Sequence, residues 1–220
     1  MDQRVELLGG TQFFADLPTD DLRVLAAAST ERRFVRGDVI FSEGESATEM
    51  FAVVRGRVAI ANRSFDGRES VVALMEPGDL FGEMGLLDGR GRSTDARALE
   101  TSVLLAVPYA PIADLFESRP ALLWGIVRLL AGRLRSTDEA LADSVFLDVT
   151  GRTAKRLLEL AGDKDEFQLP VTQEELAGMV GASRERVNKA ISSFIRLGWI
   201  DQSERRYRIL DREKLAQRSR

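Results

Sequence analysis

The apolar pattern of this chain changes period at about residue 118, and that change limits the folds open to it. Between residues 31 and 107, short runs of Val, Ile, Phe and Leu alternate with turn residues at a spacing of roughly ten. This pattern predicts a compact antiparallel β-barrel or roll. From Pro120 to about Phe146 the pattern has the period of a helix, interrupted only by two glycines that a helix tolerates. A β domain is therefore followed by a single helix of about 27 residues, roughly 40 Å long.

The expected elements of the first part can be placed individually. A short helix at about residues 19–28 precedes the β region. Each expected turn has a glycine beside a charged residue or a proline, which favours a chain reversal. These glycines are Gly37, Gly44, Gly56, Gly67 and Gly78, and the strands between them are expected to include residues 39–41, 50–54, 58–60 and 71–74.

The composition excludes several classes of function. The chain contains neither cysteine nor histidine. Disulfides, iron–sulfur clusters, zinc sites with Cys or His ligands, His-ligated haem and Ser–His or Cys–His catalysis are therefore excluded. Carboxylate or lysine catalysis is not excluded, but no paired carboxylates stand out among the 35 Asp and Glu residues. We expect no catalytic residue, no metal site and no covalent cofactor, so we do not expect an enzyme.

Charge is distributed unevenly along the chain. Residues 149–220 carry 15 Lys and Arg against 11 Asp and Glu, whereas residues 1–148 carry 16 against 24. A basic C-terminal part on an acidic body is typical of polyanion binding by that part alone, although a solvated surface would give the same counts. No window approaches 18 uninterrupted apolar residues, and the N-terminus lacks the pattern of a signal peptide. We therefore expect a cytoplasmic protein with no membrane partner.

The long helix carries a heptad seam, in which apolar residues are spaced alternately by four and three. The seam could pack against the chain's own barrel. Other apolar residues beside the seam can make that contact, so the seam is left for a second copy, and we expect a homodimer. The seam comprises Leu123, Val127, Leu130, Leu134, Thr137, Leu141 and Ser144, and the residues beside it are Leu122, Trp124, Ile126 and Leu129.

The helical pattern is interrupted at residues 146–152, and we place a domain boundary there. A further helix is expected at about 150–161, followed by a polar turn at 162–166. The chain then has three expected parts, which are a β-roll at 1–117, a dimerisation helix at 118–146 and a C-terminal domain at 147–220.

Two short helices with strong capping signals lie in this C-terminal domain. Thr172 and Glu175 have the capping-box pattern, in which each side chain accepts a hydrogen bond from the other residue's backbone N–H. Gly181 permits a tight turn, and Ser183 can cap a second helix. The buried stripe of that helix is expected to be Val187, Ile191 and Phe194. This arrangement predicts a helix-turn-helix over residues 172–194.

The outer face of the second helix is polar and suits base recognition. Arg and Lys donate to guanine O6 and N7, and Glu accepts from cytosine N4. Many helical hairpins only pack, so this polar face is what favours DNA binding. Beyond it, residues 197–200 and 207–210 flank a charged turn at 203–206, which predicts a β-hairpin wing beside the phosphate backbone. The expected DNA contacts are Thr172, Gln173, Ser183, Arg184, Glu185, Asn188 and Lys189.

Three segments of the chain resemble the cyclic-AMP receptor protein/fumarate-nitrate regulator (CRP/FNR) family of bacterial transcription factors. Residues 171–189 look like that family's DNA-binding motif, and residues 146–152 are similar to its hinge. Residues 81–85 and 92–94 resemble its phosphate-binding cassette. The likeness covers nearly the whole chain. It implies an α+β fold with an N-terminal cyclic-nucleotide-binding β-roll of jelly-roll type, a long dimerisation helix and a C-terminal winged helix-turn-helix.

The cassette residues also suit a cyclic nucleotide by their chemistry. Gly82 lets backbone N–H groups approach a phosphate, Arg92 supplies a forked guanidinium, and Ser93 adds a hydroxyl donor. Glu83 can only accept, which suits a ribose hydroxyl. Without the resemblance, such residues would most often be ordinary loop residues. The resemblance implies that Gly82, Glu83, Met84, Gly85, Arg92 and Ser93 hold phosphate and ribose, and that Thr137 and Asp138 meet the base.

Two neighbouring residues of the long helix, Thr137 and Asp138, are expected to contact the base. Thr137 is a polar residue on the seam, where it either fixes the helix register or faces a ligand near the dimer axis. Asp138 stands where family members that bind cyclic AMP commonly have Ser or Asn. Guanine offers a carboxylate two adjacent donors, so we hypothesise that a guanine nucleotide binds at least comparably to cyclic AMP. The alternative is that Asp138 faces solvent or pairs with Arg135.

The resemblance implies a homodimeric, cyclic-nucleotide-responsive regulator that recognises a palindromic operator in double-stranded DNA. The expected effector is cyclic AMP, with cyclic GMP or cyclic di-GMP as alternatives, and its binding repositions the recognition helices. RNA polymerase is an expected partner, although the loop at 162–167, where known members touch it, is short. Lys189 replaces an Arg of many members and keeps the charge without the fork. Two alternatives stay open, which are the same fold binding DNA without a ligand and a nucleotide sensor with no DNA role.

Overall fold

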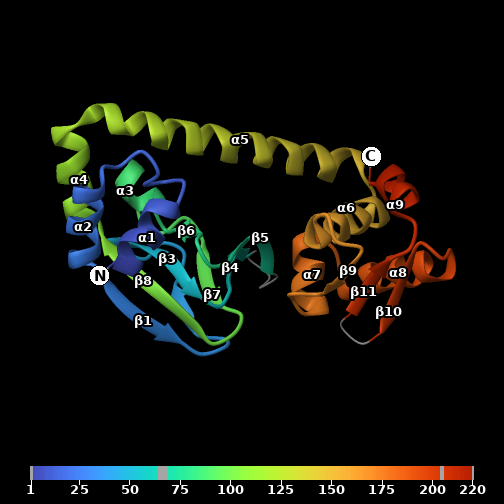
Figure 1. Cartoon of the computed structure of the whole chain (residues 1–220). Coiled ribbons are helices and arrows are strands. Elements are labelled where there is room, and N and C mark those ends of the chain that lie inside the picture. The colour runs from blue at the N-terminus through green and yellow to red at the C-terminus, as the bar shows by residue number, and fades with distance from the viewer. Residues whose placement is uncertain (1, 64–68, 204–205, 220) are drawn as a thin grey trace. The chain divides into compact units, whose positions relative to one another are not determined.

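The structure, a computed structural model, describes residues 2–63, 69–203 and 206–219 (Figure 1). The chain divides into two compact units, Met1–Leu134 and Arg135–Arg220. The division falls inside the long helix α5 (Leu123–Phe146), so each unit contains part of it. The domain boundaries expected after residues 117 and 146 stay predictions. The turn expected at Gly67 lies outside the described residues.

Two four-stranded antiparallel sheets form the β-roll of the first unit. One sheet has the strand order β1-β8-β3-β6 and the other β2-β7-β4-β5. All four expected strands are present, and their bounds extend the predicted runs by a few residues at most. The strands are β1 (Thr30–Phe34), β2 (Val39–Phe41), β3 (Glu49–Arg55), β4 (Val58–Arg63), β5 (Glu69–Met75), β6 (Leu80–Phe81), β7 (Asp95–Ala98) and β8 (Ser102–Pro108).

Three phenylalanine rings form the centre of the roll. Phe41 comes from one sheet, and Phe51 and Phe81 come from the other. The ring centroids of Phe51 and Phe81 are 5.5 Å apart, and each lies about 6 Å from that of Phe41. All three side chains are buried. The alternation of the sequence therefore places one face of each sheet in a shared core, as predicted.

Helices cover the outer face of the β1-β8-β3-β6 sheet, where Met50, Ala52, Leu105 and Val107 point away from the three rings. They form a second apolar cluster there that includes Leu8, Leu25, Ile112 and Phe116. The predicted helix is α2 (Thr19–Ala28), while α1, α3 and α4 were not predicted. Two of these are short, and the apolar run of β8 continues without a break into the third, which hides the change of period. Their bounds are α1 (Asp2–Gly10), α3 (Met84–Asp88) and α4 (Tyr109–Ser118).

The long helix begins with a single 3-10 turn at Pro120–Leu122 and continues as α5. Ile126 is buried in the helical cluster, and Leu122 and Leu129 pack against it, as predicted. Leu130, expected on the seam, also packs against this cluster, so the seam prediction is wrong at that residue. The prediction that Trp124 packs against the roll is wrong, because its side chain is 66% exposed. Two residues from Ile126 is about 200° around a helix, so Trp124 lies on the opposite face. Among the described residues, no helix is long and apolar enough to span a membrane.

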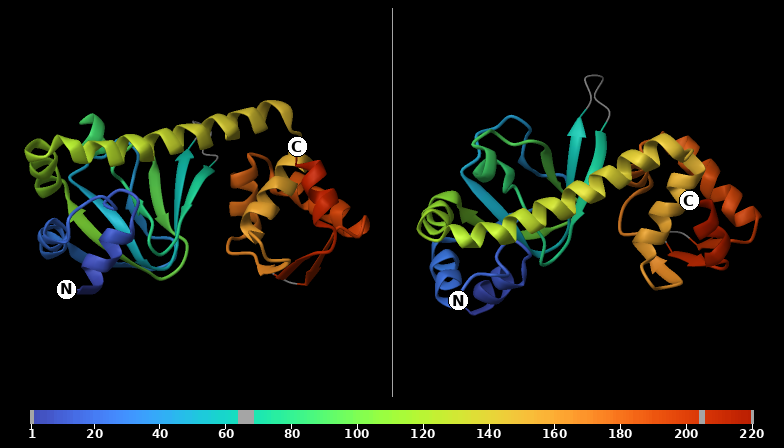
Figure 2. Two further views of the ribbon diagram at one scale, coloured as in Figure 1. Left: turned by 45° about the horizontal axis from the view of Figure 1, so that its top comes forward. Right: turned by 90° about the horizontal axis from the view of Figure 1, so that it is seen from above.

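The second unit contains a winged helix-turn-helix. Its three-stranded antiparallel sheet has the order β10-β11-β9. Glu166 belongs to a strand, so the polar turn expected at 162–166 is one residue too long. A C-terminal helix, α9, follows the wing and was not predicted. The elements are α6 (Val149–Ala161), β9 (Glu166–Gln168), α7 (Gln173–Val180), α8 (Arg184–Arg196), β10 (Ile200–Ser203), β11 (Arg206–Ile209) and α9 (Arg212–Arg218). Figure 2 shows these helices gathered on the small sheet.

Candidate nucleotide and DNA sites

Two glycines of the predicted cassette are required by its geometry. Gly82 follows β6 with φ +81°, and a Cβ there would lie 2.7 Å from Nη1 of Arg92. A Cβ on Gly85 would lie 2.6 Å from the Cβ of Ala47. Both positions therefore need glycine for the local packing, the first also for its backbone conformation. Met84 begins α3 and is 37% exposed.

Arg92 is buried beside the Gly82 turn, and its guanidinium is held by the protein. Nη1 donates to the carbonyl oxygen of Gly82 at 2.9 Å and to the hydroxyl of Tyr109 at 3.2 Å, and Nη2 donates to the carbonyl oxygen of Glu49 at 2.8 Å. The guanidinium carbon lies 4.1 Å from the ring centroid of Phe41, a cation–π distance. Its buried Nε has no partner among the described residues. A cation fixed by oxygens and an aromatic face is preorganised for an anion.

Glu83 is the second buried charge of the cassette, with an exposed fraction of 1%. Its Oε1 accepts a hydrogen bond from Nη1 of Arg133, which comes from α5. Its Oε2 is buried and accepts no hydrogen bond from the described residues. A buried acceptor without a donor is costly, so this oxygen suits a hydroxyl donor of a ligand.

Two residues of this site were missed by the sequence reasoning. Arg133 lies four residues before Thr137 and therefore on the same helix face, which is a signal that could have found it. Tyr109 accepts from Arg92 and donates to the carbonyl oxygen of Gly82, but it starts α4 and has no local signal. Burial raises the pKa of Tyr109, against the smaller lowering effect of Arg92, so its hydroxyl stays a donor at neutral pH.

The other predicted ligand residues are exposed. Ser93 directly follows Arg92. Thr137 and Asp138 lie on the second half of α5, which belongs to the second unit, whereas the cassette belongs to the first. The structure thus brings together Gly82, Glu83, Gly85 and Arg92, while contact of Thr137 and Asp138 with the same ligand stays a prediction.

The predicted caps of the helix-turn-helix are present. The backbone N–H of Thr172 donates to Oε2 of Glu175 at 2.7 Å, and the backbone N–H of Glu175 donates to Oγ1 of Thr172 at 3.2 Å. Gly181 ends α7 with φ +67°. Ser183 caps α8 by accepting from the backbone N–H of Arg186. These contacts confirm the local structure that the sequence predicts over residues 172–194.

The two faces of α8 differ as predicted, apart from one residue. Val187, Ile191 and Phe194 are buried, and Phe194 stacks on Trp199 with centroids 5.7 Å apart. Asn188 is half-buried, and its Oδ1 has no partner among the described residues. This corrects the expectation of a fully displayed side chain. The exposed residues of the outer face are Arg184, Glu185, Lys189 and Ser192.

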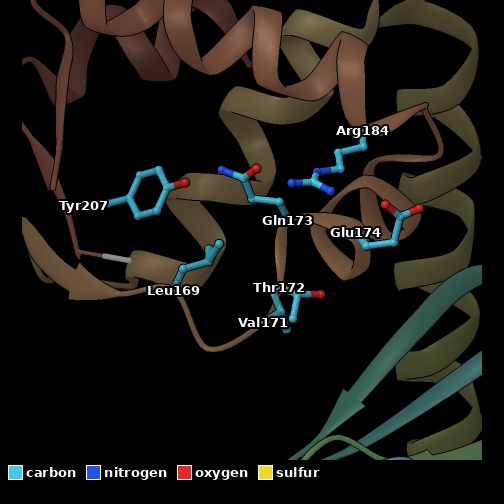
Figure 3. A pocket seen from close by; sticks show the side chains of 7 residues that line it. All are labelled: Leu169, Val171, Thr172, Gln173, Glu174, Arg184 and Tyr207. Carbon is cyan, nitrogen blue, oxygen red and sulfur yellow. The ribbon is translucent and has the colours of Figure 1, made fainter. Parts of the chain in front are cut away.

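A cleft of about 310 Å³ opens beside this helix, at the start of α7 (Figure 3). Gln173 and Arg184 lie at its centre, and the Tyr207 hydroxyl points toward the Gln173 amide. Burial raises the pKa of Tyr207, and Gln173 beside it lowers this pKa by a smaller amount. Three predicted DNA contacts therefore share one cleft with a residue of the wing. The cleft is lined by Leu169, Val171, Thr172, Gln173, Glu174, Arg184 and Tyr207.

The wing is a β-hairpin, as predicted, but its first strand begins at Ile200 and not at residue 197. Ser203 and Arg206 of the expected turn belong to the two strands, and residues 204–205 lie outside the described residues. Ile200 pairs with Ile209, and Gln202 pairs with Tyr207. Strand β9 adds to the other edge of β11, where Phe167 stacks on Tyr207 with ring centroids 5.7 Å apart. This third strand is a feature that the sequence reasoning missed.

Two family models match the chain. The model described as "Cyclic nucleotide-binding domain" matches residues 31–119, and the "Crp-like helix-turn-helix domain" matches residues 151–218. The two matches lie on the β-roll and on the winged helix-turn-helix.

Several curated proteins are similar over most of the chain. The "CRP-like cAMP-activated global transcriptional regulator" of Mycobacterium tuberculosis is 36% identical over 222 residues, which cover 98% of this chain and 99% of that protein. The "cAMP-activated global transcriptional regulator Vfr" of Pseudomonas aeruginosa is 32% identical over 186 residues, which cover 80% of this chain and 87% of that protein.

Solved structures are similar as well. The c-di-GMP responsive global regulator CLP of Xanthomonas campestris has a TM-score of 0.75 and 26% identity, covering 87% of this chain and 99% of its own. The catabolite activator protein of Thermus thermophilus has a TM-score of 0.55 and 29% identity, covering 95% and 98%. FixK2 of Bradyrhizobium japonicum, with a TM-score of 0.78 and 22% identity over 87% and 98%, shares the fold.

A cyclic-nucleotide-binding β-roll, a long helix and a winged helix-turn-helix define a class of DNA-binding regulators that respond to a cyclic nucleotide. Within that class, the chain belongs to the CRP/FNR family of transcription regulators.

Proposed function

We propose that this protein is a homodimeric transcription regulator that binds a cyclic nucleotide in its β-roll and a palindromic operator with its two helix-turn-helix units. The observation that carries the nucleotide site is the pair of buried charges, Arg92 and Glu83, beside the Gly82 turn. A cyclic phosphate suits the fixed guanidinium, and a ribose hydroxyl suits the buried Oε2 of Glu83. A nucleotide carries both groups at neighbouring positions.

Homodimerisation is supported by the seam of α5. Leu134 and Leu141 are 62% and 63% exposed, and Val127, one heptad before Leu134, is 49% exposed. A row of large apolar side chains along one helix is typical of an interface. In the proposed dimer these residues meet their counterparts in the second copy, and Thr137 lies on the same seam next to the nucleotide base.

Operator binding is assigned to the outer face of α8. Arg184, Glu185 and Lys189 are exposed there and contact base edges, while Thr172, Gln173 and Ser183 contact phosphates. Two recognition helices in a symmetric dimer face successive major grooves about 34 Å apart. The nucleotide acts by binding more tightly to the arrangement in which both helices fit the operator.

The identity of the effector depends on Asp138. The relatives from M. tuberculosis and P. aeruginosa are named as cAMP-activated, whereas the X. campestris regulator is described as responsive to cyclic di-GMP. Because the carboxylate of Asp138 suits guanine, we propose that a guanine nucleotide binds at least as well as cyclic AMP. Calorimetric titration tests this, and cyclic AMP binding at least tenfold more tightly than both cyclic GMP and cyclic di-GMP would contradict it.

Contact with RNA polymerase is proposed without the 162–165 loop. Only four residues separate α6 from β9, and Arg212 donates to the carbonyl oxygens of Gly162 and Lys164 at 2.9 and 2.7 Å. This short, internally bonded loop offers little surface to a partner. Activation of transcription would use another surface to contact RNA polymerase. Repression, in which the bound protein blocks access of the polymerase to DNA, needs no such contact.

A gel-shift titration on a symmetric operator with two TGTGA half-sites tests the proposed function. Wild-type protein is compared with Arg92→Ala in cyclic AMP, cyclic GMP and cyclic di-GMP, and Arg90→Ala is the matched control because Arg90 lies in the same loop with an exposed side chain. We expect a nucleotide to strengthen binding by wild type and Arg90→Ala but not by Arg92→Ala. A response that survives Arg92→Ala refutes the phosphate assignment, and tight binding that no nucleotide alters indicates the ligand-independent alternative. Thermal unfolding checks that each variant is folded.

A further inference from the structure

The junction between α5 and α6, residues 147–148, depends on one carboxylate. Phe146 ends α5 and Val149 begins α6. Asp148 caps α6, because its Oδ1 accepts a hydrogen bond from the backbone N–H of Gly151 at 2.8 Å. The direction in which α6 leaves the junction is therefore linked to the position of the Asp148 side chain.

A residue near the C-terminus of the described chain binds the same carboxylate. Nη2 of Arg218, in α9, donates to both oxygens of Asp148. The backbone of α9 also approaches α6 closely, because a Cβ on Gly151 would lie 3.0 Å from the carbonyl oxygen of Arg218. The cap of α6 and the end of α9 thus share one side chain, 70 residues away from Arg218 in the sequence.

The other end of α9 holds the other end of α6. Arg212 donates to the carbonyl oxygens of Gly162 and Lys164, and its Nε lies 3.2 Å from Oδ1 of Asp165. Between the two arginines, Leu215 is fully buried. Helix α9 therefore lies along α6 and is held by hydrogen bonds of Arg212 at one end and Arg218 at the other, but only Arg218 contacts the junction.

The remaining contacts of the junction come from α6 itself. Lys155 pairs with Asp143 in the last turns of α5. Arg152 donates to the carbonyl oxygen of Leu147 at 2.6 Å and to that of Val180, at the end of α7, at 2.9 Å. A change in direction of α5 relative to α6 must rearrange these contacts. One of them, from Arg152 to Val180, joins α6 to the first helix of the helix-turn-helix.

We propose that Arg218 is a positioning residue that sets the α5–α6 junction through Asp148, so that the C-terminal helix tunes how strongly the nucleotide controls operator binding. This inference rests on the proposed function. Without Arg218 the junction samples more arrangements, including the DNA-binding one in the absence of nucleotide. Asp148 and Arg218 are 64% and 33% exposed at their side chains, so the pair is weak, and we expect about a two- to fivefold change.

The test compares wild type, Arg218→Ala and Arg212→Ala in the full chain. Arg212→Ala is the matched control because it removes an arginine from the same helix at the end remote from the junction. The first readout is the ratio of operator dissociation constants without and with cyclic AMP and, separately, cyclic GMP. The second is hydrogen exchange of the Gly151 amide in nucleotide-free protein, which needs no effector.

We expect Arg218→Ala to lower the ratio two- to fivefold, mainly by tighter binding without nucleotide, and to accelerate exchange at Gly151. Arg212→Ala leaves both readouts within error of wild type, even if it lowers the midpoint of thermal unfolding as much as Arg218→Ala does. The proposal is overturned by an unchanged ratio in Arg218→Ala, or by equal changes in both variants, which would indicate loss of α9 packing alone. If wild type responds to no nucleotide, the proposed function fails, and unaltered exchange at Gly151 in Arg218→Ala then overturns the positioning role separately.

Discussion

Substitution of Gly82 by alanine tests the geometry of the cassette. At φ +81° an L side chain costs about 1–2 kcal/mol. In addition, the new Cβ would lie 2.7 Å from Nη1 of Arg92, so the guanidinium must move away from the turn. Displacing a charged donor from a phosphate removes about 1.5–3 kcal/mol. We therefore expect Gly82→Ala to weaken cyclic-nucleotide binding by about 10- to 100-fold.

Gly89→Ala is the matched control for this substitution. Gly89 ends α3 with φ +69°, so alanine there carries a similar backbone cost, but no atom lies within 4 Å of the added Cβ. Both variants should lower the midpoint of thermal unfolding by several degrees. Calorimetric titration with cyclic AMP and cyclic GMP should show a loss of affinity only in Gly82→Ala. Wild-type affinity in Gly82→Ala, or an equal loss in Gly89→Ala, would refute the reasoning.

Three further substitutions test a helix cap, the seam of α5 and the carboxylate of Asp148. Thr172→Ala removes half of the capping box and should lower the free energy of unfolding of the second unit by about 0.5–2 kcal/mol in chemical denaturation, whereas no change would show that the cap is dispensable. Leu141→Glu places a charge on the exposed seam and should shift sedimentation toward the monomer; an unchanged dimer would place the interface elsewhere. The hydrogen bond from the backbone N–H of Gly151 holds the pKa of Asp148 below its ordinary 3.8, and Arg218 lowers this pKa to a smaller extent. The ionised carboxylate therefore stabilises the folded protein at neutral pH, and this stabilisation is lost as the pH falls below about 4. Asp148→Asn should therefore unfold less steeply with acid than wild type, and identical acid profiles would contradict this.

Elements specified by local chemistry could be predicted from the sequence. The caps at Thr172 and Ser183, the turn at Gly181 and the strands of the β-roll all depend on residues within a few positions of one another. The buried stripe of α8 follows from its period alone. These signals were sufficient for the fold class and for the helix-turn-helix.

Contacts between distant segments could not be predicted in this way. Arg133 reaches Glu83 across 50 residues, and Arg218 reaches Asp148 across 70. Arg133 could have been suggested as a site residue by its place on the helix face of Thr137, but nothing near Glu83 or Asp148 identifies the arginine that pairs with it. Burial of a single side chain is equally hard to predict from local sequence. Trp124 is apolar and close in sequence to buried Ile126, but it lies on the opposite helix face and is exposed.

The resemblance, more than the spacing, identified the cassette. A Gly-Glu pair and an Arg-Ser pair ten residues apart occur in ordinary loops. The structure adds what sequence could not supply, namely that Arg92 and Glu83 are both buried, that Glu83 keeps one oxygen without a donor among the described residues, and that Tyr109 bonds to both Arg92 and Gly82. These features arise from the folding of β3, β6 and α4 around one turn.

In the proposed function, a cyclic nucleotide controls operator binding. Fluorescence anisotropy of a labelled symmetric operator, titrated with wild-type protein with and without each of the three nucleotides, measures this directly. We expect at least one nucleotide to lower the dissociation constant tenfold or more, a coupling of about 1.4 kcal/mol. A dissociation constant that is the same in all four conditions would contradict it.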